Sequence, residues 1–184
     1  MIFIFDLDGT LVDTTELHCK TFVDAFKDFG LTVSPVDVRK LIGISGQDIA
    51  RNLGADEPSA VFARKTELFI NRLEEVKEIE GATEVIMKLK SRGHIVCIAT
   101  ACNREMTDAI VGKFRWELDM IVTADDVVNS KPAPDTLNKI LDEFKGPAVF
   151  IGDSKYDREM ANRIKMPSYI LGDDIDSLLE ILKL

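Results

Sequence analysis

The chain has 184 residues, of which 46% are hydrophobic and 30% charged, as is usual for a globular protein with one domain or with a core that carries a smaller lobe. Its formal net charge of −9 disfavours a surface that neutralises the phosphates of DNA or RNA. No stretch approaches the roughly 18 consecutive apolar residues of a membrane span, so we expect neither a nucleic-acid nor a membrane partner.

The first predicted element is a strand at residues 2–5, an apolar run that ends in Asp6 and Asp8. Residues 14–80 then contain no convincing strand. Their apolar residues recur at helical spacing, which predicts helices at residues 15–29, 36–41, 47–53 and 58–77. We expect this segment to form an inserted helical lobe that packs against a larger domain and moves relative to it.

The remainder of the chain alternates strands with helices. Four further apolar runs predict strands at residues 95–99, 120–122, 148–151 and 169–171. Helical patterns precede or follow them at residues 81–92, 104–114, 135–144, 155–164 and 174–182. The alternation predicts an α/β fold, a doubly wound, Rossmann-like parallel sheet with helices on both faces. We expect a core domain of residues 1–13 and 81–184 and a helical cap domain of residues 14–80.

Candidate site residues follow the first four predicted strands, where ligands collect in open α/β sheets. The residues concerned are Asp6 and Asp8 after the first strand, Thr100, Ala101 and Asn103 after the second, Lys131 after the third, and Asp153 and Asp157 after the fourth. We expect them to converge on one rim of the sheet.

These residue types suit phosphoryl chemistry. Carboxylates are the ligands that Mg²⁺ prefers, and Asp6 and Asp153 form the most evident pair. The Thr100 hydroxyl and the Lys131 ammonium can match the remaining charge of a phosphate. One aspartate can then attack phosphorus while a second, Asp8, acts as general acid and base.

Four short motifs carry a resemblance to a known family. They are Phe-Asp-Leu-Asp-Gly-Thr at residues 5–10, the Thr that closes Val-Cys-Ile-Ala-Thr at residue 100, Ser-Lys-Pro-Ala-Pro-Asp at residues 130–135, and Gly-Asp-Ser-Lys-Tyr-Asp at residues 152–157. With these four motifs in this order, the chain resembles the phosphatases of the haloacid dehalogenase superfamily that carry a small helical cap after the first strand. Within that superfamily it is similar to the phosphoglycolate phosphatase and β-phosphoglucomutase subgroup.

The resemblance implies a role for each matched residue. Asp6 would be the nucleophile and a Mg²⁺ ligand, and Asp8 would be the general acid/base whose backbone carbonyl also contacts the metal. Asp153 would be the third metal contact, and Asp157 would hold either the water shell of the metal or Lys131. Thr100 and Lys131 would bind the phosphoryl group that is transferred.

The resemblance also implies residues that shape or contact the substrate. Gly9 and Thr10 would form the turn that lets the backbone approach phosphate, and Ala101 and Asn103 would contact the substrate. His18 would face the substrate or the hinge of the cap. The loop of residues 43–46 resembles a cap loop that faces the active site in β-phosphoglucomutase, which adds Gly43 and Ser45.

Departures from the relatives narrow the expected activity. Asp8 argues against dehalogenation, because dehalogenases of this superfamily lack a carboxylate there. Mutases carry a phosphate-binding Arg where this chain has Gly46, which favours hydrolysis. Phosphonatases need a cap lysine, which residues 41–53 do not offer and for which Lys40 is a weak substitute. The resemblance therefore implies a Mg²⁺-dependent, phosphoglycolate phosphatase-like hydrolase of small phosphate esters that forms an aspartyl phosphate.

Two other functions stay open. A β-phosphoglucomutase-like phosphomutase would pass the phosphoryl group to a sugar phosphate, and a non-enzymatic phospho-aspartate signalling or binding module would take up phosphate once. We expect a monomer or a homodimer. The cysteines Cys19, Cys97 and Cys102 are odd in number and lack the spacing of a zinc site, so we expect the protein in the reducing cytoplasm.

Overall fold

The computed structural model describes all 184 residues and has a parallel five-stranded sheet at its centre. The strands lie in the order β5-β4-β1-β6-β7, with bounds Met120–Val122, Ile95–Ala99, Ile2–Phe5, Ala148–Gly152 and Ser168–Ile170. The first strand of the chain is therefore the middle strand of the sheet. All four of its residues are buried, which explains why its sequence is apolar without alternation. The predicted α/β class is confirmed.

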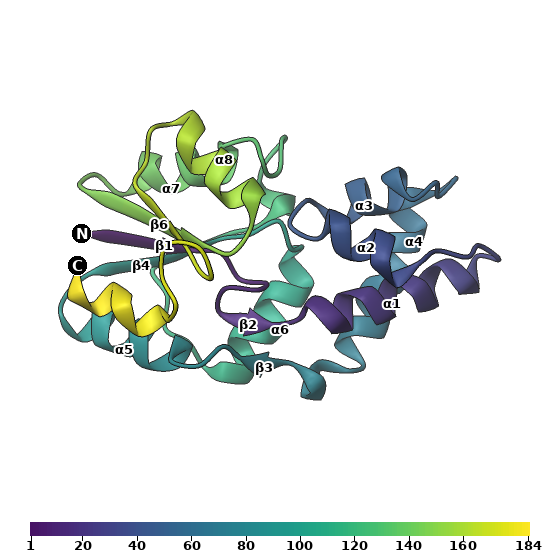
Figure 1. Ribbon diagram of the computed structural model, residues 1–184, viewed down its shortest axis with the longest axis horizontal. Coiled ribbons are helices and arrows are strands. Elements are labelled where there is room, and N and C mark those ends of the chain that lie inside the picture. The colour runs from purple at the N-terminus through teal and green to yellow at the C-terminus, as the bar shows by residue number, and fades with distance from the viewer.

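Helices cover both faces of this sheet (Figure 1). Ile2 and Ile4 point to the face packed by α7 (Asp135–Glu143) and α8 (Lys155–Arg163). Phe3 and Phe5 point to the opposite face, where the core includes residues of three other elements, namely α5 (Ala82–Ser91), α6 (Arg104–Phe114) and the 3₁₀ helix η3 (Leu178–Lys183). The alternation of side chains along one strand thus fills two layers of core.

The helical insertion consists of α1 (Thr15–Asp28), α2 (Pro35–Leu41), α3 (Gly46–Asn52) and α4 (Pro58–Ile70). Figure 1 shows it beyond the carboxyl ends of the sheet strands, with α1 and α4 side by side. Its Phe22, Phe26 and Phe69 belong to the same buried cluster as Phe3 and Phe5 of the sheet. The insertion and the sheet therefore share a continuous apolar core.

A two-stranded antiparallel ribbon connects the insertion to the sheet, and it corrects part of the sequence analysis. The strands β2 (Val12–Asp13) and β3 (Lys77–Glu78) pair with each other, so the segment of residues 14–80 does contain a short strand. The last helix of the insertion ends at Ile70 rather than at residue 77, and the 3₁₀ turn η1 (Leu73–Glu75) follows. Lys113 of α6 holds this turn, since its Nζ donates to the carbonyl oxygens of Leu73, Glu74 and Val76.

Smaller differences occur near the carboxyl terminus and beside the third strand of the chain. The predicted helix at residues 174–182 is the short 3₁₀ segment η3, because Asp174 closes a turn by accepting a hydrogen bond from the backbone N–H of Ile170. The final strand begins and ends one residue earlier than expected. A short 3₁₀ helix, η2 (Ala124–Asp126), follows β5. None of the helices combines the length and apolar character needed to span a lipid bilayer.

Candidate active site

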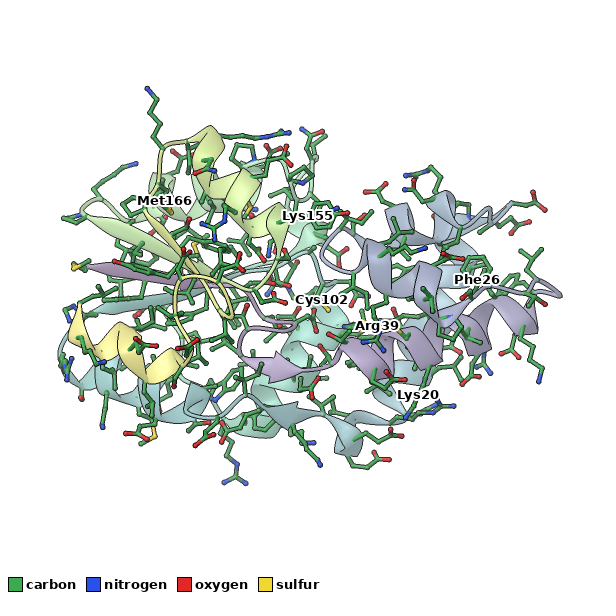
Figure 2. The ribbon with its side chains drawn as sticks, in the orientation of Figure 1. Lys20, Phe26, Arg39, Cys102, Lys155 and Met166 are labelled. Carbon is green, nitrogen blue, oxygen red and sulfur yellow. The ribbon has the colours of Figure 1, made fainter.

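The carboxyl ends of β1 and β4 meet the helical insertion around a cavity of about 40 Å³. Asp6, Asp8 and Thr100 line it from the sheet side, and residues of α1, α3 and α4 line it from the insertion. Cys102, labelled in Figure 2, lies on its wall at the junction of the two parts. We call the group of Asp6, Lys131, Asp153 and Asp157 the core end of the site, and the group of His18, Lys65, Phe22 and Phe62 the insertion end.

A buried lysine joins two aspartates at the core end. The Nζ of Lys131 lies 2.5 Å from Asp6 Oδ1 and 2.7 Å from Asp157 Oδ1, and all three side chains are buried. Burial alone would lower the pKa of Lys131, but the charges of Asp157 and Asp6 outweigh it and raise that pKa above its ordinary value. The structure therefore brings together residues that stand more than a hundred positions apart in the sequence.

Three carboxylates crowd the same end. Oxygens of Asp6, Asp153 and Asp157 lie within 4.8 Å of one another. Burial, opposed by Lys131 and reinforced by the other two carboxylates, raises the pKa of Asp6, and burial together with Asp157 raises the pKa of Asp153 to about 6. A divalent cation would relieve this repulsion, so the donor set fits a hard metal ion.

Asp157 is committed to protein partners within this cluster. One of its oxygens accepts from Lys131, and the other accepts from Ser154, whose backbone N–H lies at 3.0 Å and whose hydroxyl lies at 2.6 Å. Of its two predicted roles, the structure displays the contact with Lys131. Asp6 and Asp153 are then the side chains best placed to offer oxygens to a metal.

The turn after β1 brings the backbone against Asp153. Gly9 has φ +83°, and a Cβ added there would lie 2.2 Å from Asp153 Oδ2. Only glycine fits that position without displacing the carboxylate. The next residue, Thr10, donates from its hydroxyl to Asp153 Oδ1 over 3.3 Å. Gly9 and Thr10 thus shape the cluster of acids.

Asp8 is held from one side by the start of α1. The Thr14 hydroxyl at 2.6 Å and His18 Nε2 at 2.9 Å both contact its Oδ1, while Oδ2 makes no hydrogen bond within the protein. Burial alone would raise the pKa of Asp8, but His18, Thr14 and the charge of Lys65 outweigh it and hold that pKa well below its usual range. One carboxylate oxygen stays free on a side chain that lines the cavity.

Lys65 is a residue of the site that the sequence analysis missed. It extends from α4 into the cavity, is 1% exposed, and its Nζ lies 2.6 Å from His18 Nδ1 and 3.1 Å from Met106 Sδ. Because an ammonium only donates and a carboxylate only accepts, His18 accepts from Lys65 at Nδ1 and donates to Asp8 from Nε2. Burial lowers the pKa of Lys65 to about 8.

A signal for Lys65 was present in the sequence. Phe62, Lys65 and Phe69 recur at the spacing that places them on one side of a helix, so the lysine stands on the apolar side of α4. A lysine in that position is either paired or functional. Lys40, considered as a cap lysine, is exposed and bound to Asp37. Lys65 supplies a lysine from α4. The lack of a lysine in residues 41–53 is therefore no argument against a reaction that uses a cap lysine.

The other predicted residues divide between two spaces. Thr100, Ala101 and Gly43 line the cavity, and the Thr100 hydroxyl accepts from the backbone N–H of Cys102 over 3.0 Å. Asn103 and Ser45 line a neighbouring cleft of about 370 Å³. Their side chains cap helices, because each accepts from the backbone N–H three residues further along, at Met106 and Asp48.

Gly46, the position at which mutases carry an arginine, is packed by an aromatic ring. A Cβ added to Gly46 would lie 2.0 Å from Cε2 of Phe62. A larger residue at this position would displace Phe62, which is buried in the shared core.

Comparison with known proteins extends these observations. Residues 3–171 match the family model described as haloacid dehalogenase-like hydrolase. The pyrophosphatase PpaX of Bacillus cereus (strain B4264) is 30% identical over 161 residues, which span 84% of this chain and 74% of that protein.

Solved structures share the fold. A candidate phosphoglycolate phosphatase from Lactobacillus plantarum superposes with a TM-score of 0.87 at 22% identity, over 99% of this chain and 97% of that one. CbbY from Rhodobacter sphaeroides, crystallised in complex with phosphate, superposes with a TM-score of 0.84 at 23% identity, over 98% of this chain and 95% of that one. At these identities the two structures support the fold alone. The match of the family model over nearly the whole chain shows that the protein belongs to the haloacid dehalogenase-like hydrolases.

Proposed function

We propose that this chain is a Mg²⁺-dependent phosphohydrolase that acts on small phosphate esters through an aspartyl phosphate at Asp6. The observation that carries the proposal is the buried contact of Asp6 with Lys131, beside a second aspartate that has a free oxygen and lines the same cavity. The name of the pyrophosphatase relative supports a substrate that contains phosphate.

In the first step an oxygen of Asp6 attacks phosphorus, and the bond between phosphorus and the leaving oxygen breaks. A proton on Asp8 passes to the leaving oxygen, which departs as an alcohol. Lys131 is placed to interact with the transferred phosphoryl group because it contacts Asp6 directly. The negative charge of a bound phosphate raises the pKa of Asp8 and so favours the protonated form that this step requires.

In the second step water attacks phosphorus and gives a proton to Asp8, while the bond between phosphorus and Asp6 breaks. Inorganic phosphate leaves, Asp6 is regenerated, and Asp8 ends the step protonated, ready for the next ester. The hydrogen bonds from Thr14 and His18 stabilise Asp8 as a carboxylate, which is the form that accepts this proton.

The side chains of Asp6 and Asp153 and the backbone carbonyl of Asp8 would hold the Mg²⁺. When bound, the ion neutralises part of the charge of the phosphate and so lets a carboxylate approach it. The repulsion among the clustered acids of the core end supports this assignment.

We further propose that residues 14–80 act as a cap that closes over the cavity and excludes bulk water. The support is that residues of α1, α3 and α4 form one wall of the cavity and that the β2–β3 ribbon brings both connections of this segment together.

The three cysteines are unpaired and buried, which supports a working location in the reducing cytoplasm.

Hydrolysis is favoured over a phosphomutase reaction by Gly46. A mutase must hold a second phosphate, and the ring of Phe62 fills the space into which an arginine at that position would extend. A non-enzymatic module is disfavoured by the burial of Asp6, which is 4% exposed, because a phosphorylated signalling residue must be reached by a partner protein.

Phosphate release tests the three functions together. The protein is incubated with ethyl phosphate, p-nitrophenyl phosphate or pyrophosphate and Mg²⁺, without any bisphosphate, and phosphate is counted per chain. Many equivalents support the phosphohydrolase. One equivalent at most supports a module. Conversion of a sugar phosphate into its isomer, without phosphate release and only after a sugar bisphosphate is added, identifies a mutase.

A further inference from the structure

The ammonium of Lys65 is a buried charge without a protein anion beside it. Its hydrogen-bond partners are the imidazole of His18 at 2.6 Å and the thioether of Met106 at 3.1 Å. Asp8 is the nearest acid along this chain of contacts, and it is reached only through His18. Burying an ammonium is costly unless a counter-charge accompanies it.

Three aromatic rings stabilise the buried charge of Lys65 in part, as a counter-charge would. The Nζ of Lys65 lies 4.6 Å from the centroid of Phe69, 5.3 Å from that of Phe22 and 5.9 Å from that of Phe62. Such contacts stabilise a cation without removing any of its three donor hydrogens. Two of these hydrogens face His18 and Met106, so one donor remains for a ligand.

The position of Lys65 relative to the nucleophile indicates which part of a ligand it would meet. Lys65 and Asp6 line the same cavity, and Lys65 is the only lysine or arginine that does so. Asp6 lines this cavity from the sheet and Lys65 lines it from α4. A leaving group attached to a phosphate at Asp6 can therefore extend toward Lys65.

We propose that Lys65 binds an anionic group on the leaving part of the substrate, so that the preferred substrates are small phosphate esters or anhydrides whose leaving group carries a carboxylate or a second phosphate. This inference rests on the proposed function. The apolar rings exclude water around the contact, and Lys65 selects the substrate while Asp6 and Asp8 carry out the reaction. Neutral alcohols of the same size lose this contact.

The test compares leaving groups of similar size and different charge. The ratio kcat/KM is measured for phosphoglycolate, pyrophosphate and ethyl phosphate with the wild type and with Lys65→Met, which keeps the apolar stem. We expect the wild type to prefer at least one anionic substrate over ethyl phosphate, and Lys65→Met to lose about 10- to 100-fold more on that substrate than on ethyl phosphate, as for a hydrogen bond to a charged group. The anion with the larger loss identifies the carboxylate or the phosphate as the natural group.

Two further variants separate charge from packing. Lys65→Gln keeps a donor for His18 but carries no charge, so it should reproduce the loss seen with Lys65→Met. Lys40→Met removes an exposed lysine of the insertion and should leave all three ratios unchanged. Equal losses on all three substrates in the Lys65 variants, or a wild type without preference, would overturn the inference while leaving the phosphohydrolase in place.

A binding measurement keeps the inference separate from catalysis. Calorimetry with Asp6→Asn, which lacks the nucleophile, should give tighter binding of phosphoglycolate or pyrophosphate than of ethyl phosphate. The double variant with Lys65→Met should abolish that difference. If no substrate is hydrolysed by the wild type, the proposed function fails and this measurement alone decides whether Lys65 is an anion site; no difference in binding would reject it.

Discussion

The core end and the insertion end of the site each bury a lysine, and the two lysines are compensated in opposite ways. Lys131 has carboxylate oxygens at 2.5 and 2.7 Å, whereas Lys65 has an imidazole nitrogen at 2.6 Å and a sulfur at 3.1 Å. Their pKa values shift in opposite directions for that reason. The charge of Lys131 is compensated within the protein, whereas Lys65 keeps a donor hydrogen for a ligand.

The largest effect should come from the nucleophile at the core end. Asp6→Asn removes the attacking oxygen, so turnover of p-nitrophenyl phosphate should fall on the order of 10⁴-fold or more. Asp142→Asn, which changes an exposed carboxylate, is the matched control and should keep wild-type rates. Comparable rates for Asp6→Asn and the control would remove Asp6 from the mechanism.

Asp8 lies between the two ends, and the loss in kcat on its substitution should depend on the leaving group. Asp8→Asn cannot transfer a proton, and the loss in kcat should reach about 10²- to 10⁴-fold for ethyl phosphate. It should be smaller for p-nitrophenyl phosphate, whose leaving group departs without protonation. The control is Asp13→Asn, an exposed carboxylate on β2. A loss of the same size for both substrates would argue that Asp8 has a structural role only.

Stability measurements on the two lysines test the comparison most directly. Lys131→Met leaves two buried carboxylates unpaired and should lower the free energy of unfolding by about 3–5 kcal/mol. Lys65→Met removes a buried charge that no carboxylate accompanies, so it should leave the free energy of unfolding unchanged or raise it. Urea denaturation at pH 7 without metal provides both values. Equal destabilisation by the two variants would show that the lysines are compensated alike.

Magnesium should stabilise the core end in a pH-dependent way. Because the folded protein holds the Asp153 proton more tightly than the unfolded chain, the stability that this proton contributes is complete below about pH 4 and is lost as the pH rises through about 6. At pH 7.5 a metal ion displaces no proton from Asp153, and at pH 5 it must do so.

Thermal unfolding with and without Mg²⁺ checks this expectation. At a concentration near 100 times Kd the ion should add about 2.7 kcal/mol at pH 7.5, which corresponds to roughly 5–10 °C in Tm for a chain of this size. The rise should be clearly smaller at pH 5. A rise of the same size at both pH values would mean that Asp153 is not among the groups the metal replaces.

The two ends also differ in how well the sequence predicted them. The core-end residues stand in short motifs directly after buried strands, and the end of a parallel strand determines where its next side chain lies. Asp6, Thr100 and Asp153 could therefore be placed from the strand pattern. Lys65 stands in the middle of a helix, and its position depends on how α4 packs against α1, which periodicity does not reveal.

The fold, too, could be predicted only where a local sequence pattern determines it. Continuous apolar runs such as residues 2–5 identified the strands, and the alternation with helices indicated the parallel sheet. The β2–β3 ribbon escaped because each of its strands has only two residues, too few for an alternating pattern. The helix expected to reach residue 77 ends at Ile70, and Lys113, 37 residues beyond Val76, binds the carbonyl oxygens of the turn that follows it. Contacts of that range are invisible to a local pattern.

The ribbon also makes the insertion exchangeable. The chain leaves the sheet side at Val12–Asp13 and returns at Lys77–Glu78, and these two pairs of residues lie against each other. A segment inserted between these two pairs of residues begins and ends at the same place. Its length and shape therefore do not affect the register of the five strands. A graft of another helical segment between residues 18 and 77 would keep Thr14 and His18 against Asp8 and would carry a different selectivity onto the same catalytic residues.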